Sequence, residues 1–239
     1  MASFYHIESL DSTSTYLKSN YKKYDNLTFL SCSLQLKGRG RENRVWYSEK
    51  GENLLFSILI KDKDLIENYE KLSIYTSLII VKQLTKLGIN NASIKWPNDV
   101  YVNDKKIAGI LLEGISDNNG VNAIIIGIGI NVNSRDFKEN YNMTPTSIYL
   151  ETNKEIDLEL FKNDIYKDLL KMFEDIKNDI SYIEEIRKRN YLKDKCVYAL
   201  VNGERCLVDV IDINNNCTLK VKKDDVIYDV FAGEITFHL

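Results

Sequence analysis

The chain has 239 residues, a formal net charge of −3 and a hydrophobic share of 44%. This length allows one hydrophobic core with a small second domain, and no apolar run approaches the ~20 residues that a membrane-spanning helix needs. The acidic balance argues against a protein that coats nucleic acid. The first eight residues lack the basic and apolar segments of a secretory signal, so we expect a cytoplasmic protein without a membrane partner.

The first two thirds of the chain predict a sheet with a packed helix. Apolar runs over residues 28–36 and 53–60 indicate two strands, joined by a long charged loop of a length that is commonly functional. Apolar residues at helical spacing over 71–87, followed by Gly88, predict a helix with a glycine at its end. A meander of strands is then predicted by the runs over 93–96, 100–102, 106–115 and 121–132.

The remaining chain changes from helical to strand patterns near Asn190. Asp157 can cap an amphipathic helix, and a second helical segment extends to about Arg189. A small β-barrel is predicted by the short runs over 196–201, 205–213, 217–222, 226–231 and 235–237. The expected fold class is therefore α+β, with a mixed or antiparallel sheet and packed helices in residues 1–189 and a small barrel in residues 190–239.

The long loop is the first candidate for chemistry. It reads Lys37-Gly38-Arg39-Gly40-Arg41-Glu42-Asn43-Arg44-Val45-Trp46, with four cations and two glycines. Arginine binds phosphate and carboxylate oxygens bidentately, and glycine lets backbone N–H groups approach an anion closely. The loop therefore suits an anionic ligand, although composition alone leaves a solvated basic loop or a nucleic-acid patch open.

Two further motifs carry polar residues at strand ends. Lys95-Trp96-Pro97-Asn98-Asp99 presents Asn98 and Asp99 in a turn, because proline keeps the residue before it extended. Lys106 opens a second segment, Lys106-Ile107-Ala108-Gly109-Ile110-Leu111, and the two lysines can flank one cleft; each taken singly is more often a surface charge. Gly127-Ile128-Gly129-Ile130-Asn131 lacks the third glycine of a dinucleotide fingerprint, and its glycines alone favour close backbone packing.

In chain order these blocks resemble the biotin protein ligases. The resemblance begins at Asp11-Ser12-Thr13-Ser14, covers about residues 7–133 and returns weakly at Phe231-Ala232-Gly233-Glu234-Ile235. Ser14 stands where the family usually has asparagine, which changes one polar contact. Asn43 stands where the family usually has a third glycine, and asparagine tolerates the positive φ that glycine adopts.

The resemblance implies a fold and an activity. The fold would be a catalytic domain like that of class II aminoacyl-tRNA synthetases with an SH3-like C-terminal barrel. The activity would be ATP-dependent biotinylation of a lysine on a biotin carboxyl carrier protein, through biotinyl-5′-AMP, with ATP, biotin and Mg²⁺ as substrates and cofactor. Because the Ser-Thr block begins at Ser12, we expect a monofunctional ligase without the DNA-binding domain that some family members carry.

The resemblance also implies roles for particular residues, with Lys106 and Arg39 as the catalytic pair. The biotin-binding residues would be Ser12, Thr13, Gln35, Gly38, Arg39, Arg41, Lys106, Gly109, Leu111 and Gly127. The ATP-binding residues would be Arg41, Arg44, Trp46, Asn98, Asp99, Lys106 and Asn131. The four cysteines and two histidines show no metal-ligand spacing, so the metal ligands are left open. The oligomeric state is also left open.

Two other functions compete with this interpretation. A lipoate or octanoate ligase or transferase shares the superfamily and also uses a lysine in an acyl-transfer site. A non-catalytic nucleic-acid-binding module could use the basic loop and the small barrel, and it would bind oligonucleotides in a salt-dependent manner. The arginine-glycine loop and the Trp-Pro-Asn-Asp turn together favour the biotin ligase.

Overall fold

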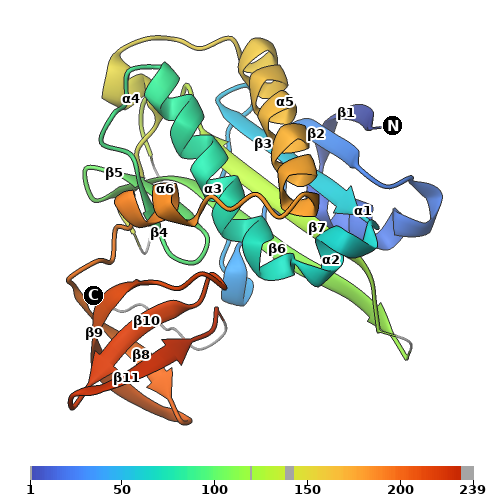
Figure 1. The fold of residues 1–239 in the computed structure, drawn as a ribbon. Helices are drawn as coiled ribbons and strands as arrows, with labels where there is room; N and C mark the ends of the chain where they lie inside the picture. The colour runs from blue at the N-terminus through green and yellow to red at the C-terminus, as the bar shows by residue number, and fades with distance from the viewer. Residues whose placement is uncertain (1, 119, 138–142, 233–239) are drawn as a thin grey trace.

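The computed structural model describes residues 2–118, 120–137 and 143–232, which form two β-sheets with helices packed on the larger one (Figure 1). The larger sheet has the strand order β1-β2-β3-β7-β6-β5-β4. Its strands are β1 (Ser3–Leu10), β2 (Thr28–Gln35), β3 (Asn53–Ile60), β4 (Ser93–Lys95), β5 (Asp99–Val102), β6 (Lys105–Asp117) and β7 (Gly120–Asn131). β1 pairs with β2 in parallel and the other neighbours are antiparallel, which confirms the predicted mixed sheet and its meander.

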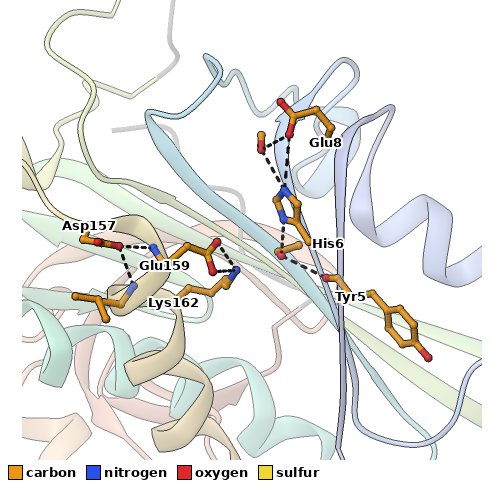
Figure 2. Close-up of polar contacts among 9 residues, drawn as sticks. Tyr5, His6, Glu8, Asp157, Glu159 and Lys162 are labelled. Carbon is orange, nitrogen blue, oxygen red and sulfur yellow. Dashed lines mark hydrogen bonds and ion pairs between the residues drawn. The ribbon is translucent and has the colours of Figure 1, made fainter.

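Two long helices cover one face of this sheet. α3 (Tyr69–Lys86) and α5 (Leu158–Lys177) pack on each other and on the sheet, as the patterns predict. Gly88 follows α3 with a φ of +92°, and the Asp157 carboxylate accepts hydrogen bonds from the first N–H groups of α5 (Figure 2). The other helical segments are α1 (Thr13–Asn20), η1 (Tyr21–Lys23), η2 (Arg41–Asn43), α2 (Lys63–Glu67), α4 (Ile148–Thr152) and α6 (Ile183–Lys188). No helix among the described residues is long and apolar enough to cross a membrane.

Strand alternation gives the two faces of the sheet different chemistry. On β7, Ile126, Ile128 and Ile130 belong to the core beneath α3 and α5. Because successive side chains point to opposite faces, Gly127 and Gly129 lie on the other face. α1 covers one end of that second face through Leu17, which packs with Leu59 and Ile125. The glycine-bearing middle of this face is where the candidate site lies.

The smaller sheet follows α6 and is antiparallel throughout, with the order β11-β10-β9-β8. Its strands are β8 (Cys196–Val201), β9 (Glu204–Ile213), β10 (Leu219–Lys223) and β11 (Val226–Val230). Asn202 and Gly203 both have positive φ at the first hairpin, as the predicted turn requires. The run over 235–237 lies outside the described residues, and the domain boundary and the SH3-like form stay predictions.

The two sheets meet at β4. The backbone of Ile94 bonds with Arg189 and Tyr191 on the segment that leads to the smaller sheet. Trp96 is 2% exposed and donates a hydrogen bond from its Nε1 to the carbonyl oxygen of Cys217 at 2.8 Å. The segment that precedes β10 therefore contacts Trp96, which lies between β4 and the turn that carries Asn98 and Asp99.

Candidate active site

A cavity of about 390 Å³ lies on the second face of the large sheet, beneath the loop over residues 37–50. This volume falls within the roughly 300–1,000 Å³ of small-molecule sites. All but one of the sequence-predicted site residues line it: Ser12, Thr13, Gln35, Arg39, Arg41, Arg44, Trp46, Asn98, Asp99, Lys106, Gly109, Leu111, Gly127 and Asn131. The exception is Gly38, which lies at the base of the loop. Its backbone packs so closely on Trp46 that a Cβ at this position would lie 2.2 Å from the Trp46 carbonyl oxygen.

The floor of the cavity is made of glycine backbone. Gly109 on β6 pairs with Gly129 on β7, and Gly127 lies two residues before Gly129 on the same strand. A Cβ on Gly129 would lie 2.5 Å from the Trp46 ring, and a Cβ on Gly127 would lie 2.4 Å from Ser14 Oγ. The glycines therefore serve both close packing and the site, because they let Trp46 and Ser14 approach the sheet.

One end of the cavity, named here the hydroxyl end, is lined by Thr13, Ser14 and Gln35, with Ser57 buried behind them. Gln35 Oε1 accepts hydrogen bonds from the backbone N–H and the Oγ1 of Thr13, at 2.8 and 3.1 Å. The Ser57 hydroxyl lies 2.7 Å from Thr13 Oγ1 and 2.9 Å from Ser14 Oγ. These groups are neutral, buried for the most part, and able to both donate and accept hydrogen bonds.

The opposite end, named here the cationic end, contains Arg41, Arg44, Lys95 and Lys106. Lys106 Nζ lies 2.7 Å from Asp99 Oδ1 and 5.7 Å from the centroid of the Trp46 ring. Arg44 forms an ion pair with Glu42 at 2.9 Å. Positive charge thus collects at one end of the cavity, whereas Arg39, which reaches Thr15 near the hydroxyl end, is paired with the Glu113 carboxylate.

Arg41 connects the loop to two other parts of the chain. Its Nη1 donates to Asn98 Oδ1 at 3.1 Å and its Nη2 donates to the carbonyl oxygen of Ala232 at 2.5 Å. Asn98 Nδ2 in turn donates to the carbonyl oxygen of Ile110 at 2.8 Å. Asn98 therefore positions Arg41 at the cavity.

Lys95 is 3% exposed and lines the cavity beside Lys106. Removal from water lowers the pKa of its ammonium to about 8. The Asp99 carboxylate acts in the opposite direction and favours the charged form, whereas the positive charges of Lys106, Lys195 and Arg44 lower the pKa further. A desolvated lysine of this kind is typical of functional sites.

The loop folds back on itself through an antiparallel bridge between Arg39 and Val45. Arg39 also contacts the rim of the cavity, where its guanidinium donates to the Glu113 carboxylate at 3.2 Å. Glu42 in this turn has a positive φ of 53°. The expectation for Asn43 stays a prediction.

Two predicted nucleotide-binding residues differ in how they are held. The Asn131 side chain donates to the carbonyl oxygen of Thr146 and accepts a hydrogen bond from Asn53, both at 3.0 Å. In contrast, the Nε1 of Trp46 is buried without a hydrogen-bond partner among the described residues. Trp46 thus has a free donor within the cavity, whereas the Asn131 amide is already engaged by the protein.

The structure adds residues that the sequence did not assign to the site. Ser14 and Tyr101 line the cavity, and Ser57 supports it through Ser14. Ser57 lies in the middle of an apolar strand, so its role depends on the pairing of Ser57 with Gly127 across β3 and β7. The sequence predicts the turn before Tyr101, but the direction of the Tyr101 side chain can be known only from the register of the sheet.

Within the described residues, no group of three or more His, Cys, Asp or Glu side chains could hold a metal ion. The two carboxylates that line the cavity are Glu42 and Asp99, and each is paired with a cation, Arg44 or Lys106. Mg²⁺ binding to protein usually requires one or two available carboxylates. The side chains as arranged do not fit a resident Mg²⁺ site, so none is assigned.

A histidine, two serines and a carboxylate also meet on β1 and β2, outside the cavity (Figure 2). His6 Nδ1 lies 3.0 Å from Ser31 Oγ, and His6 Nε2 lies 3.2 Å from Ser33 Oγ. Ser33 donates to Glu8, whose carboxylate lies on the same Nε2 side of the ring. Glu8 lies 4.0 Å from His6 Nε2, which is beyond hydrogen-bonding distance, and the Ser31 hydroxyl donates to the carbonyl oxygen of Tyr5, so this group is not a nucleophilic triad.

The model of the biotin/lipoate A/B protein ligase family matches residues 6–131. The chain belongs to this family. The match spans the cavity from the hydroxyl end to Asn131 and includes both lysine-bearing segments of the cationic end.

Several individual relatives extend the family match. The chain is 27% identical to the bifunctional ligase/repressor BirA of Escherichia coli, over 95% of this chain and 71% of that protein. It is 33% identical to the BirA of Bacillus subtilis, and the match covers only 41% of that relative's length. In structure, it resembles the biotin protein ligase from Aquifex aeolicus in complex with biotin and ATP, with a TM-score of 0.85, 27% identity and coverage of 99% and 98% of the two chains.

Proposed function

We propose that the protein is a biotin protein ligase, which activates biotin with ATP and transfers it to a lysine of an acceptor protein. The observation that carries this proposal is the polarity of the cavity. A neutral hydroxyl end suits the uncharged ureido head of biotin, and a cationic end suits a carboxylate and phosphates. The structural likeness to a biotin protein ligase in complex with biotin and ATP supports the same conclusion.

The hydroxyl end favours biotin over lipoate or octanoate. A ureido group has two N–H donors and one carbonyl acceptor, which can bond with Thr13, Ser14 and Gln35 at the cavity wall. The dithiolane ring of lipoate and the chain of octanoate cannot make these bonds. Each hydrogen bond that biotin makes here and the competing acids cannot make is worth about 0.5–1.5 kcal/mol.

In the first step, an oxygen of the biotin carboxylate attacks the α-phosphorus of ATP. A bond forms between that oxygen and phosphorus, and the bond to the bridging oxygen breaks, so that pyrophosphate leaves and biotinyl-5′-AMP remains. Both reactants are anions, and Lys106 at the cationic end would contact the carboxylate and the α-phosphate. Arg39 and Arg41 would add positive charge from the loop, which lowers the energy of the crowded transition state.

In the second step, the amine of an acceptor lysine attacks the acyl carbon of biotinyl-5′-AMP. The C–O bond to the phosphate breaks, AMP leaves, and the nitrogen loses a proton as the amide forms. No side-chain nucleophile of the enzyme takes part in either step. The acceptor would be a biotin carboxyl carrier domain, in keeping with a 37% identical relative named biotin–[acetyl-CoA-carboxylase] ligase, from Paracoccus denitrificans, matched over 41% of each chain.

The reaction also needs Mg²⁺ and the exclusion of water. Mg²⁺ is proposed to enter as the MgATP complex, because Glu42 and Asp99 are paired with Arg44 and Lys106. The loop over residues 37–50 lies above the cavity and would exclude water from the reactive mixed anhydride. Its Arg39–Val45 bridge makes it a compact cover.

The test is to incubate the protein with biotin, MgATP and a purified biotin carboxyl carrier domain, and to measure the mass of the carrier. We expect the mass to increase by one biotinyl group at one lysine. Parallel incubations contain lipoate or octanoate in place of biotin. Modification by lipoate or octanoate and not by biotin would overturn the proposal in favour of the related acyl ligases.

A further inference from the structure

The loop over residues 37–50 is held at both ends of the cavity. At the cationic end, Arg41 bonds to a side chain and to a backbone carbonyl of two other segments. At the hydroxyl end, the Arg39 guanidinium donates to Thr15 Oγ1 on α1 and to the Glu113 carboxylate on β6. The proposed reaction gives no role to Glu113, although this residue joins the loop to the wall of the cavity.

Glu113 lies between two cations that come from different elements. Because side chains alternate along β6, Glu113 is on the same face as Gly109 and Leu111, which line the cavity. Its side chain is 12% exposed, and Oε1 lies 3.1 Å from Lys18 Nζ on α1 and 3.2 Å from Arg39 Nη2. Arg39 Nη1 donates to the second oxygen at 3.5 Å, so the guanidinium and the carboxylate meet side by side.

The two partners of Glu113 allow the contact with the loop to open and close. Lys18 belongs to α1, which is fixed on the sheet by the buried Leu17, whereas the Arg39 side chain is 44% exposed. When the loop lifts, Lys18 remains with Glu113, so the largely buried carboxylate keeps a counter-ion. The Arg39–Glu113 pair is partly open to water and contributes only a modest free energy. It can therefore break and reform once in each turnover.

We propose that Glu113 is a positioning residue, which holds Arg39 and thereby keeps the loop closed over the hydroxyl end while the acyl-adenylate waits for its acceptor. The identity of the adenylate rests on the proposed function. Glu113 takes no part in making or breaking bonds. Biotinyl-5′-AMP is lost if it diffuses away or reacts with water before an amine arrives, so the time for which the loop stays closed determines how much of it reaches the acceptor.

The first test measures loop opening without any substrate. Hydrogen exchange followed by mass spectrometry reports on the backbone amides of residues 37–50, where the N–H groups of Gly40, Arg44 and Trp46 donate hydrogen bonds within the loop. We expect Glu113→Gln, which keeps the shape of the side chain but not its charge, to speed exchange in this segment about threefold. Exchange in α1 and β6 should stay at the wild-type rate, because the change acts on the loop.

The matched control is Lys18→Met, which removes the other cation from the same carboxylate. Glu113 then depends on Arg39 for its counter-ion, so exchange in the loop should stay unchanged or become slower. A merely structural role of Glu113 predicts instead that both variants loosen α1 and β6 together. That result, or equal acceleration of loop exchange by Glu113→Gln and Lys18→Met, would overturn the proposal.

A double variant tests whether Glu113 acts through Arg39. If it does, Arg39→Gln combined with Glu113→Gln should exchange no faster in the loop than Arg39→Gln alone. Additive acceleration would contradict the proposal. Should Glu113→Gln fail to fold, salt gives the same information, because rising ionic strength should speed loop exchange in the wild type and have no effect in Arg39→Gln. An equal response of these two proteins to salt would also contradict it.

The second test measures how long the adenylate is retained. Each protein is incubated with biotin and MgATP and separated from the excess, and release of biotinyl-5′-AMP into buffer without acceptor is followed by mass spectrometry. Glu113→Gln should release it about threefold faster than the wild type, and Lys18→Met at the wild-type rate or more slowly.

The two tests separate this inference from the proposed function. If the protein forms no adenylate from biotin, but Glu113→Gln speeds loop exchange and Lys18→Met does not, the closing contact stands and the proposed function is wrong. If the adenylate forms and Glu113→Gln releases it at the wild-type rate, the function stands and the role of Glu113 is wrong.

Discussion

The hydroxyl end and the cationic end of the cavity are built on the same sheet face, yet they are organised in opposite ways. At the hydroxyl end, Thr13, Ser14, Gln35 and Ser57 bond to one another, so the groups are held in place before a ligand arrives. At the cationic end, Lys106 is bound to Asp99. The neutral network is completed within the protein, whereas at the cationic end the described residues that line the cavity include more cations than carboxylates.

This difference predicts different costs of binding. Preorganised hydroxyls lose little freedom when a ligand binds, so the hydroxyl end should determine which acyl substrate is selected. The cations must exchange protein carboxylates, such as Glu42 for Arg44 and Asp99 for Lys106, for phosphate or substrate carboxylate. The cationic end should therefore determine rate more than selectivity.

The largest effect is expected from removal of the Lys106 charge at the cationic end. Lys106→Met should lower adenylate formation about a hundredfold, because a charge-assisted hydrogen bond contributes ~1.5–3 kcal/mol and Asp99 loses its partner. Biotin-dependent exchange between ATP and pyrophosphate measures this step, with Lys105→Met as the control. Exchange at the wild-type rate would show that Lys106 is not the central cation.

A steric change should damage the hydroxyl end alone. In Gly127→Ala the new Cβ would lie 2.4 Å from Ser14 Oγ, so the hydroxyl network has to move. Biotin affinity measured by calorimetry should fall at least tenfold, and α,β-methylene-ATP affinity should change less than twofold. Gly114→Ala on β6 is the matched control, because its Cβ would have no heavy atom within 4 Å. An equal loss in both affinities would show that the two ends are not independent.

The smallest effect is expected at the position where this chain departs from the family pattern. Ser14→Ala removes the hydrogen bond to Ser57 but no charge, so biotin affinity should fall about fivefold. The control Ser9→Ala removes an exposed hydroxyl on β1 and should have no effect. Unchanged biotin affinity in Ser14→Ala would mean that Ser14 supports the fold without contributing to substrate binding.

The sequence predicts the central strands and most of the cavity lining because both depend on local patterns. The alternation of glycine and isoleucine over Gly127–Asn131 is visible directly, and so are the turn at Asn98 and the charges of the loop. The family resemblance brought these blocks together, since their composition alone also fitted a nucleic-acid patch. The structure adds the reason for the alternation, which is that isoleucine fills the core while glycine lies under the ligand cavity.

Other parts could not be read from the sequence for physical reasons. β1 and α1 are not predicted, because β1 is a half-exposed edge strand without a regular apolar pattern and α1 is only eight residues long. Ser57 is hidden within an apolar run, and Tyr101 follows a turn without any sign of where its side chain points. Both acquire meaning from strand pairing, with Gly127 for Ser57 and with Lys106 for Tyr101.

The position of Trp46 gives the protein a built-in optical reporter. The chain has two tryptophans, and the other, Trp96, is fixed in the core by its bond to Cys217. Trp46 lies over Gly109 and Gly129, 5.7 Å from Lys106 Nζ, and its N–H has no hydrogen-bond partner in the part of the chain that the structure describes. Occupation of the site changes the surroundings of this indole, so its ultraviolet emission should follow substrate loading in real time without any attached dye.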